Sequence, residues 1–244
     1  MDCIRVSTRP DYIDGPVLSL LKEYGVAIVE LGIQSLAQDV LESSARGHSV
    51  QQSEEALRLL KKNGFTVGAQ LMCGLPGDTT AKLMATVQKT AALAPDFVRL
   101  YPVLVLKGSG LEKLWQEGRY RALSLEKAVA LCCRMKTIFA QHGIKVVRMG
   151  LHCSAELATK VVAGPYHPAF GELVISRAFF KKTRQELSRI SKSGAGNLRM
   201  AAADESVFRG PGNVNTKRLT ALGLLEGVKL VFDPNQLRNS IICQ

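Results

Sequence analysis

Two polar side chains occupy a segment that otherwise has the composition of a buried strand. The run VAIVELGIQS, residues 26–35, is short and rich in β-branched residues, yet it contains Glu30 and Gln34. Because these residues are an even number of positions apart, both side chains should point to the same side of the strand. Inside a parallel barrel, polar groups need partners, either a bound ligand or hydrogen bonds within the protein. The sequence leaves both readings open.

A second candidate is the segment GLPGDT, which begins at Gly74 and follows a predicted strand. Glycine-rich backbone at the start of a helix presents N–H groups to anions, as phosphate-binding turns do. The chain contains neither a GxxxxGK[ST] nor a GxGxxG motif. A tight turn between a strand and a helix is therefore the simpler interpretation.

Histidine is sparse in the chain. His48 lies in the loop segment ARGHS, where a single histidine is more often a surface or capping residue than a catalyst. His152 and His167 lie in separate irregular stretches, and no acid or nucleophile has the spacing of a catalytic triad. A serine-hydrolase mechanism is therefore unsupported.

Six cysteines occupy positions 3, 73, 132, 133, 153 and 243. Their spacing matches neither C-x2-C nor C-x3-C, nor a disulfide framework. Scattered cysteines of this kind usually serve as small buried apolar residues. We therefore expect no metal ligand among them.

Short apolar runs alternate with segments of helical periodicity over the first 140 residues, which is typical of βα units and a parallel sheet. The predicted strands are residues 3–7, 26–35, 65–77, where the strand runs into a loop, and 96–106. Loops at the carboxyl ends of parallel strands carry the chemistry of such folds. The candidate segments above all lie at such ends.

Composition and charge narrow the class of protein. The 244 residues are 46% hydrophobic and 22% charged, as in ordinary globular chains. No apolar run approaches the roughly 20 residues of a membrane-spanning helix, and the start of the chain lacks the basic region of a signal peptide. We therefore expect a cytoplasmic protein with no membrane contact.

The formal net charge of +11 is unevenly distributed, with 12 basic against 5 acidic residues from Arg177 onward. Such an excess attracts polyanions, RNA foremost, although it also serves as solubilising charge in many basic enzymes. RNA is the partner that we expect for the carboxyl-terminal third.

Taken together and in order, the motifs STRPDYI, VELGIQS, ARGHSV, GFTVGAQLMCGLPGDT and DFVRLYPVLVLKGSGLEKLWQEGRY resemble the radical S-adenosylmethionine (SAM) barrel of the Elongator catalytic subunit and its smaller bacterial relatives. AGPYHPAFGELV resembles the bacterial relatives in particular. The resemblance implies an α/β fold, a partial TIM-type (β/α)6 barrel that holds SAM against a [4Fe–4S] cluster. Such a cluster delivers one electron to SAM, which gives a 5′-deoxyadenosyl radical.

The chain departs from that family in one respect. Relatives hold the cluster with cysteines in a C-x3-C-x2-C motif after their first strand, and this chain has no such motif. We therefore expect that the barrel lacks its first two βα units, that the chain is a fragment or is complemented by an N-terminal partner chain, and that it is inactive alone. Whether the chain is an enzyme as it stands is left open.

The resemblance also implies site residues and domains. Gln34, Arg46 and Gln70 match polar cofactor contacts, Glu30 joins them as a candidate, and the backbone from Gly74 to Gly77 would flank the adenine or ribose. Lys107 and Ser109 are candidate substrate contacts. The expected domains are a partial barrel (1–144), a Gly/Pro/His-rich segment with a basic helix (145–192), and a linker with a small α/β appendage (193–244).

Two alternatives remain. The runs GIQS and CGLPG also resemble oxygen-independent coproporphyrinogen oxidase, another radical SAM enzyme, although STRPDY and RLYPVLVLKGSG favour the Elongator branch. The missing cysteine motif instead favours a non-catalytic, basic RNA-binding or complex-forming remnant. RNA modification is the activity expected of the leading interpretation.

Overall fold

The computed structural model describes residues 4–152, 154–190 and 196–243. These residues form two compact units, which divide the chain after Pro168. The division falls inside the segment 145–192 that the sequence had set apart. Residues 193–195, at the start of the predicted linker, lie outside the described residues.

The first unit is built on a five-stranded parallel sheet whose spatial order is the chain order, β1-β2-β3-β4-β6. Its strands are β1 (Ile4–Thr8), β2 (Val26–Gln34), β3 (Thr66–Cys73), β4 (Phe97–Pro102) and β6 (Lys145–Met149). Crossovers between successive strands return the chain to the same end of the sheet, as in a parallel barrel. The predicted fold class, a partial TIM-type barrel with a small α/β appendage, is confirmed.

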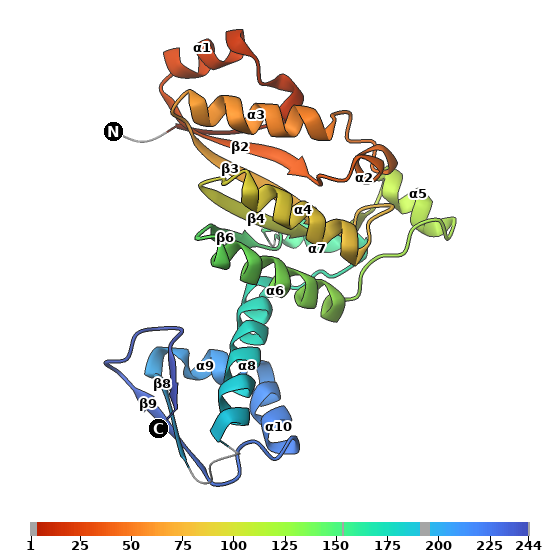
Figure 1. Ribbon diagram of the computed structural model, residues 1–244. Helices are drawn as coiled ribbons and strands as arrows, with labels where there is room; N and C mark the ends of the chain where they lie inside the picture. The colour runs from red at the N-terminus through yellow and green to blue at the C-terminus, as the bar shows by residue number, and fades with distance from the viewer. Residues whose placement is uncertain (1–3, 153, 191–195, 244) are drawn as a thin grey trace. The chain divides into compact units, whose positions relative to one another are not determined.

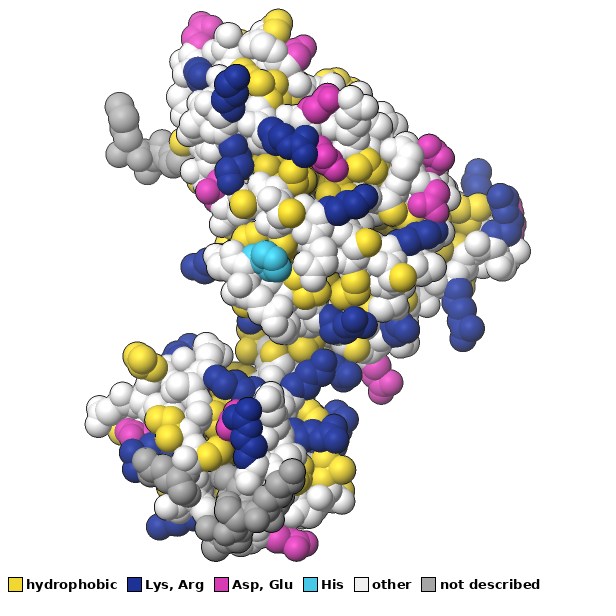
Figure 2. All heavy atoms as spheres, in the orientation of Figure 1, with side chains coloured by type: hydrophobic (Ala, Val, Ile, Leu, Met, Phe, Trp, Pro, Cys, Tyr) yellow, Lys and Arg dark blue, Asp and Glu magenta, His cyan; other side chains and the backbone are white. Residues whose placement is uncertain are grey.

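Helices cover one side of this sheet (Figure 1). The crossovers contain η1 (Pro10–Tyr12), α1 (Gly15–Glu23), α2 (Gln38–Ser43), α3 (Val50–Lys62), α4 (Thr80–Ala92), α5 (Gly110–Gln116) and α6 (Leu125–Gln141), and α7 (Ala155–Lys160) follows β6. Figure 2 views the helical side of the first unit and shows basic and acidic side chains interspersed there with apolar ones. No helix among the described residues is long and apolar enough to cross a membrane.

The helices begin and end at residues suited to those positions. Asp14, Ser49, Thr79 and Ser124 each cap a helix by accepting a hydrogen bond from a backbone N–H of the first turn. Gly64, with φ of +82°, follows the last residues of α3, where a left-handed backbone ends a helix without steric cost. These residues determine where the helices of the crossovers begin and end.

Alternation along the strands divides the sheet into an apolar face and a polar face. Every second residue of β2, β3 and β4 is apolar and almost fully buried on the helical side: Val29, Leu31, Ile33, Val67, Ala69, Leu71, Val98 and Leu100. Helix α3 packs against β2 and β3, and α6 packs against β3, β4 and β6. Burial of these side chains supplies the main hydrophobic stabilisation of the unit.

Two parts of the sheet differ from the sequence pattern. The predicted strand 96–106 is interrupted, because β4 ends at Pro102 and a separate strand β5 (Val105–Leu106) pairs antiparallel with β7 (Val161–Ala163). Proline lacks the N–H that would continue the ladder. The sequence pattern did not indicate β6, a short edge strand that places Arg148 beside Arg99 of β4.

The second unit has its own sheet and core. It contains α8 (Phe170–Ile190), β8 (Gly196–Ala201), η2 (Ala202–Asp204), α9 (Glu205–Arg209), η3 (Pro211–Asn213), α10 (Val214–Ala221), β9 (Val228–Asp233) and β10 (Ile241–Cys243). Strand β8 lies between β9, which is parallel, and β10, which is antiparallel. The buried core residues are Phe179, Phe180, Leu187, Leu198, Met200, Phe208 and Leu219.

The capping box at the start of α3 yields a prediction. Ser49 Oγ accepts from the N–H of Gln52, and the Gln52 side chain accepts from the N–H of Ser49. Ser49→Ala should lower the free energy of unfolding of the first unit by about 1 kcal/mol. Trp115, the single tryptophan of the chain, lies in this unit and can report its urea transition by fluorescence.

Ser19→Ala serves as the control, because the Ser19 hydroxyl only donates to the Gly15 carbonyl within α1. Its effect should stay within about 0.5 kcal/mol. Equal transitions for the two variants would show that the capping box does not hold α3.

Candidate functional site

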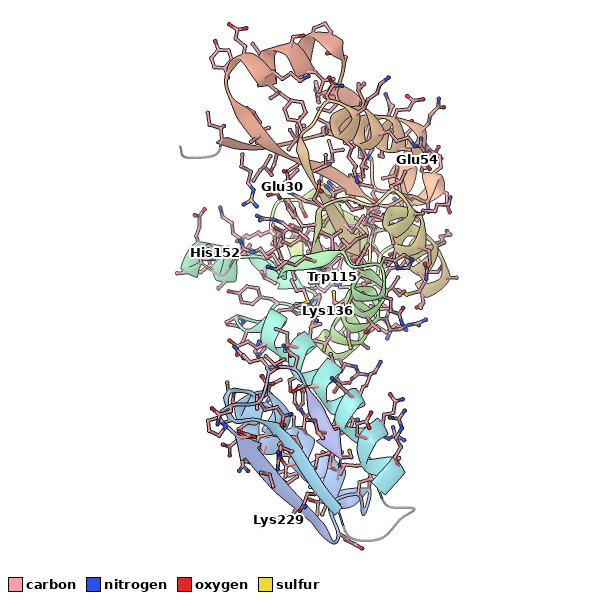
Figure 3. The ribbon with its side chains drawn as sticks, turned by 60° about the vertical axis from the view of Figure 1, so that its left-hand side comes forward. Glu30, Glu54, Trp115, Lys136, His152 and Lys229 are labelled. Carbon is pink, nitrogen blue, oxygen red and sulfur yellow. The ribbon has the colours of Figure 1, made fainter. Side chains whose placement is uncertain are left out.

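The side of the sheet opposite the helices carries the polar residues of the strands. By register and alternation this polar face comprises Arg5, Glu30, Gln70, Arg99 and Tyr101 from β1 to β4. Figure 3 shows Glu30 on the side of the strands away from Glu54 of α3. The predicted residues Glu30 and Gln70 therefore share one surface.

Glu30 is the centre of a buried charge network. Its side chain is only 2% exposed, and the Nε atoms of Arg5 and Arg99 lie 2.7 Å and 2.9 Å from its two carboxylate oxygens. The amide of Gln70 donates to the second oxygen at 3.3 Å. Of the two readings that the sequence left open, the structure supplies partners from within the protein for Glu30 and for the Gln70 amide nitrogen.

Gln34 departs from ideal strand geometry. The pairing of β2 with β3 shifts between Leu31 and Gln34, and Gln34 has a φ of +64°. A left-handed backbone is unfavourable for a residue other than glycine and is concentrated at functional sites. A Cβ added to Gly32 would lie 2.7 Å from the Gln34 amide nitrogen. The end of the Gln34 side chain therefore lies against Gly32, and strand alternation alone does not place it.

Arg46 reaches the polar face from the loop after α2. Its Nη2 lies 2.7 Å from the thioether sulfur of Met72, a residue of β3 near Gln70. Its Nε is buried without a hydrogen bond to any described residue, and burial lowers the pKa of the guanidinium. Within the described residues this cation has no carboxylate partner. A half-buried, uncompensated guanidinium is a binding group for an anion.

Contacts from two directions hold the loop that carries Arg46. Arg9 forms a bidentate ion pair with Asp11 and donates to the carbonyl of Gly47 at 2.9 Å. The Arg9 guanidinium holds the pKa of Asp11 below its usual range. His48 is buried, with its Nε2 3.3 Å from the carbonyl oxygen of Ile33. His48 therefore anchors the loop to β2, next to a surface depression of about 410 Å³ that Arg46 and His48 help to line.

The turn that contains Gly74 and Gly77 is held by protein groups. The N–H of Gly74 donates to Asp78, and the Tyr120 hydroxyl donates to the Gly74 carbonyl at 2.6 Å. Burial raises the pKa of Asp78 and raises the pKa of Tyr120 to about 12. Lys82 donates to the Gly77 carbonyl at 2.8 Å. The turn is thus a rigid βα connection whose first N–H is already used.

Lys107 and Ser109 lie in the loop between β5 and α5. Ser109 caps α5, since its hydroxyl accepts from the N–H of Glu112 and donates to the carbonyl of Leu106 at 2.6 Å. The Lys107 side chain is exposed, and its backbone N–H donates to the Lys160 carbonyl. The hydroxyl of Ser109 therefore serves the helix.

Arg5 and Arg99 are the site residues that sequence reasoning missed. Arg99 and Tyr101 alternate with buried apolar residues in β4, so the period of two carried a signal for a polar face. The proximity of Arg5 and Arg99 to Glu30 depends on the register of the four strands β1 to β4, which one sequence does not reveal.

The cysteines among the described residues are not grouped as the ligands of an iron–sulfur cluster are. Cys73 and Cys132 lie with their sulfur atoms 3.7 Å apart in the core, where both side chains are buried. The hydrogen bond between these thiols and their burial raise the pKa of Cys73. The described parts of the chain contain no group of three or more Cys, His, Asp or Glu side chains that could hold a metal.

The first unit is a partial parallel barrel with polar groups on the side opposite its helices and an arginine that has no acidic partner among the described residues. Residues 3–90 match the Radical SAM superfamily, and residues 95–179 match the Radical SAM C-terminal domain. The chain belongs to the radical SAM superfamily and is homologous to Elongator complex protein 3.

Relatives and a solved structure agree with this assignment. The chain is 33% identical over 172 residues to a tRNA uridine(34) acetyltransferase of Methanocaldococcus jannaschii, which covers 69% of this chain and 31% of the relative. It is 37% identical over 135 residues to human Elongator complex protein 3, over 54% of this chain and 25% of the relative. The archaeal Methanocaldococcus infernus Elp3 with an N-terminal deletion superposes with a TM-score of 0.64 at 28% identity, over 75% of this chain and 42% of that one.

The chain spans about a third of the length of the archaeal relative from M. jannaschii. The activities of these relatives therefore concern longer proteins.

The Glu30 network yields a prediction. Glu30→Gln removes the charge that compensates Arg5 and Arg99, so it should lower the free energy of unfolding of the first unit by about 3 kcal/mol. Urea unfolding followed by Trp115 fluorescence measures the change. The control is Glu54→Gln, which removes an exposed pair with Arg58 on α3 and should cost about 0.5 kcal/mol or less. Equal losses of unfolding free energy in the two variants would mean that the buried network stabilises the unit no more than a surface ion pair does.

Proposed function

We propose that the polar face binds SAM and that Arg46 holds its methionyl carboxylate. The observation that carries this proposal is the half-buried Arg46 guanidinium, whose contacts among the described residues are a thioether sulfur and no acid. A carboxylate would compensate this charge through bidentate hydrogen bonds. Membership of the radical SAM superfamily supports SAM as the source of that carboxylate.

The surrounding residues fit the rest of such a ligand. The Gln34 amide, held against Gly32, offers a donor and an acceptor to a ribose hydroxyl or an amino group. The Gln70 amide nitrogen is bound to Glu30, which leaves its oxygen as an acceptor toward the face. Met72 supplies an apolar contact beside Arg46. The backbone between Gly74 and Gly77 follows β3 at the edge of this region, where hydrogen bonds hold it in place.

When bound beside a reduced [4Fe–4S] cluster, SAM supplies a 5′-deoxyadenosyl radical. The described residues do not fit that cluster, so no step here passes through it. In this proposal its ligands come from polypeptide other than the described residues. Strand β1 is an exposed edge of the sheet, along which such polypeptide could add a strand.

The part of the protein described here would therefore bind and orient the cofactor. Arg46 fixes the methionyl end, and the Arg9 and His48 contacts keep its loop in place. The Glu30 network ties the four strands β1, β2, β3 and β4 together. Pre-organised residues of this kind reduce the cost of ordering a flexible ligand.

The Arg46 proposal predicts a loss of affinity. Arg46→Met should weaken binding of SAM about 10- to 100-fold, because a hydrogen bond to a charged group contributes about 1.5–3 kcal/mol. Equilibrium dialysis with labelled SAM measures this without any turnover. Arg134→Met, which removes an exposed arginine from α6, is the control and should bind like the parent protein. Unchanged affinity of Arg46→Met would refute the carboxylate role.

We further propose RNA as the substrate, with the second unit as the contact. Support comes from the basic excess after Arg177 and from the archaeal relative that is named for tRNA uridine(34). Figure 2 shows Lys and Arg over much of the visible face of this unit, with few acidic side chains. Lys181 and Arg184 are exposed on α8. Such charges bind phosphates by releasing counterions.

This contact predicts a steep salt dependence of RNA binding. Lys181→Gln combined with Arg184→Gln should reduce the slope of log K against log salt concentration by roughly 1 to 2. Fluorescence anisotropy with a labelled RNA hairpin measures the slope. Lys62→Gln combined with Lys89→Gln makes the same change of charge in the first unit and is the control. Identical slopes for the two double variants would exclude α8 as the contact.

A further inference from the structure

Two arginines lie directly opposite each other on the polar face. In the ladder between β4 and β6, Arg99 pairs with Arg148, and Leu100 pairs with Met149. Arg99 is 18% exposed and Arg148 is half-buried. Like charges at opposed positions of neighbouring strands repel each other. In the free protein, the positive charge of Arg148 beside Arg99 therefore does not stabilise the sheet.

The nearby acid does not compensate this pair. Glu30 is the one acidic side chain at the polar-face positions of β1, β2, β3, β4 and β6. Arg5 and Arg99 each form an ion pair with one of its oxygens, and Gln70 donates a hydrogen bond to the second. The Arg148 side chain makes no hydrogen bond or ion pair within the described parts of the chain. Arg5, Arg99 and Arg148 outnumber this carboxylate, and Arg46 adds a further cation to the same face, which therefore carries an excess of positive charge.

Hydrogen-bond donors also remain for a ligand. Arg5 and Arg99 contact Glu30 through Nε, the inner nitrogen of the guanidinium. The Nη1 of Arg99 lies 3.4 Å from the Tyr101 hydroxyl, a long contact that a better acceptor would replace. The terminal nitrogens of Arg99 and Arg148 and the Tyr101 hydroxyl thus form a set of donors along adjacent strands.

We propose that Arg148 and Arg99, with Tyr101, bind a phosphate group of the substrate. A phosphate offers several acceptor oxygens and a charge of −1 to −2, which matches two adjacent guanidinium groups with bidentate geometry. The inference rests on the proposed function, because the site lies on the same face as Arg46 and would belong to the molecule on which the cofactor acts. The phosphate could come from an RNA backbone or from a small phosphorylated molecule.

The test uses the full chain and inorganic phosphate as the probe. Isothermal titration should show saturable phosphate binding that Arg148→Met weakens at least tenfold and Arg148→Lys weakens less. Arg134→Met on α6 removes the same charge elsewhere and should leave phosphate binding unchanged. Absence of saturable binding, or equal binding by the Arg148→Met and Arg134→Met variants, would overturn the proposal.

A stability measurement separates a binding role from a structural one. Because Arg148 faces Arg99, Arg148→Met should leave the midpoint of thermal unfolding unchanged or raise it. A lower midpoint together with unchanged phosphate affinity would assign Arg148 to the sheet and overturn the inference. Arg46→Met should keep its phosphate binding, and Arg148→Met should keep its SAM binding. These two measurements distinguish an error in the proposed phosphate site from an error in the proposed SAM site.

Two further ligands identify the source of the phosphate. If it is an RNA backbone, a short oligouridylate should bind more tightly than uridine 5′-monophosphate and lose that advantage in Arg148→Met. If it is a small molecule, the monophosphate should bind at least as tightly as the oligomer, and Arg148→Met should weaken it. Either pattern supports the site, and binding of both ligands that is insensitive to Arg148→Met contradicts it.

Discussion

The buried carboxylate of Glu30 is the interaction on which the polar side of the first unit depends. A parallel sheet is normally covered on both faces, so strands that carry charge on one face need a way to neutralise it. Glu30 does so by joining Arg5 of the first strand to Arg99 of the fourth, with Gln70 between them. Because this network neutralises the charge of Glu30 within the protein, the other polar groups at the carboxyl ends of the strands remain available to a ligand.

The sequence predicts the architecture well because hydrophobic alternation is a local property. The strands around residues 26–35 and 65–77 and the helices between them follow from β-branched runs and capping residues. The sequence pattern did not predict β6, because this strand is short, lies at an edge of the sheet and begins with Lys145. The interrupted strand at Pro102 shows that a proline outweighs an apolar pattern that continues beyond it.

The site was less predictable, because its geometry depends on register and on backbone conformation. Even spacing placed Glu30 correctly on the polar face, but the shifted pairing and the left-handed backbone at Gln34 cannot be read from spacing. The opposition of Arg99 and Arg148 likewise exists only once β4 and β6 are paired. The family resemblance identified Arg46 as a candidate, and the structure adds that its charge has no acidic partner among the described residues.

The buried thiol pair of Cys73 and Cys132 has a practical consequence. Both sulfur atoms lie in the apolar core between β3 and α6, and the raised pKa of Cys73 keeps its thiol protonated at neutral pH. Alkylating reagents react with thiolates, so these two positions are protected while the first unit is folded. Cys243, in the last strand of the second unit, is only partly buried. The time course of alkylation, resolved by peptide mass, would therefore report the opening of each unit separately, with no added probe.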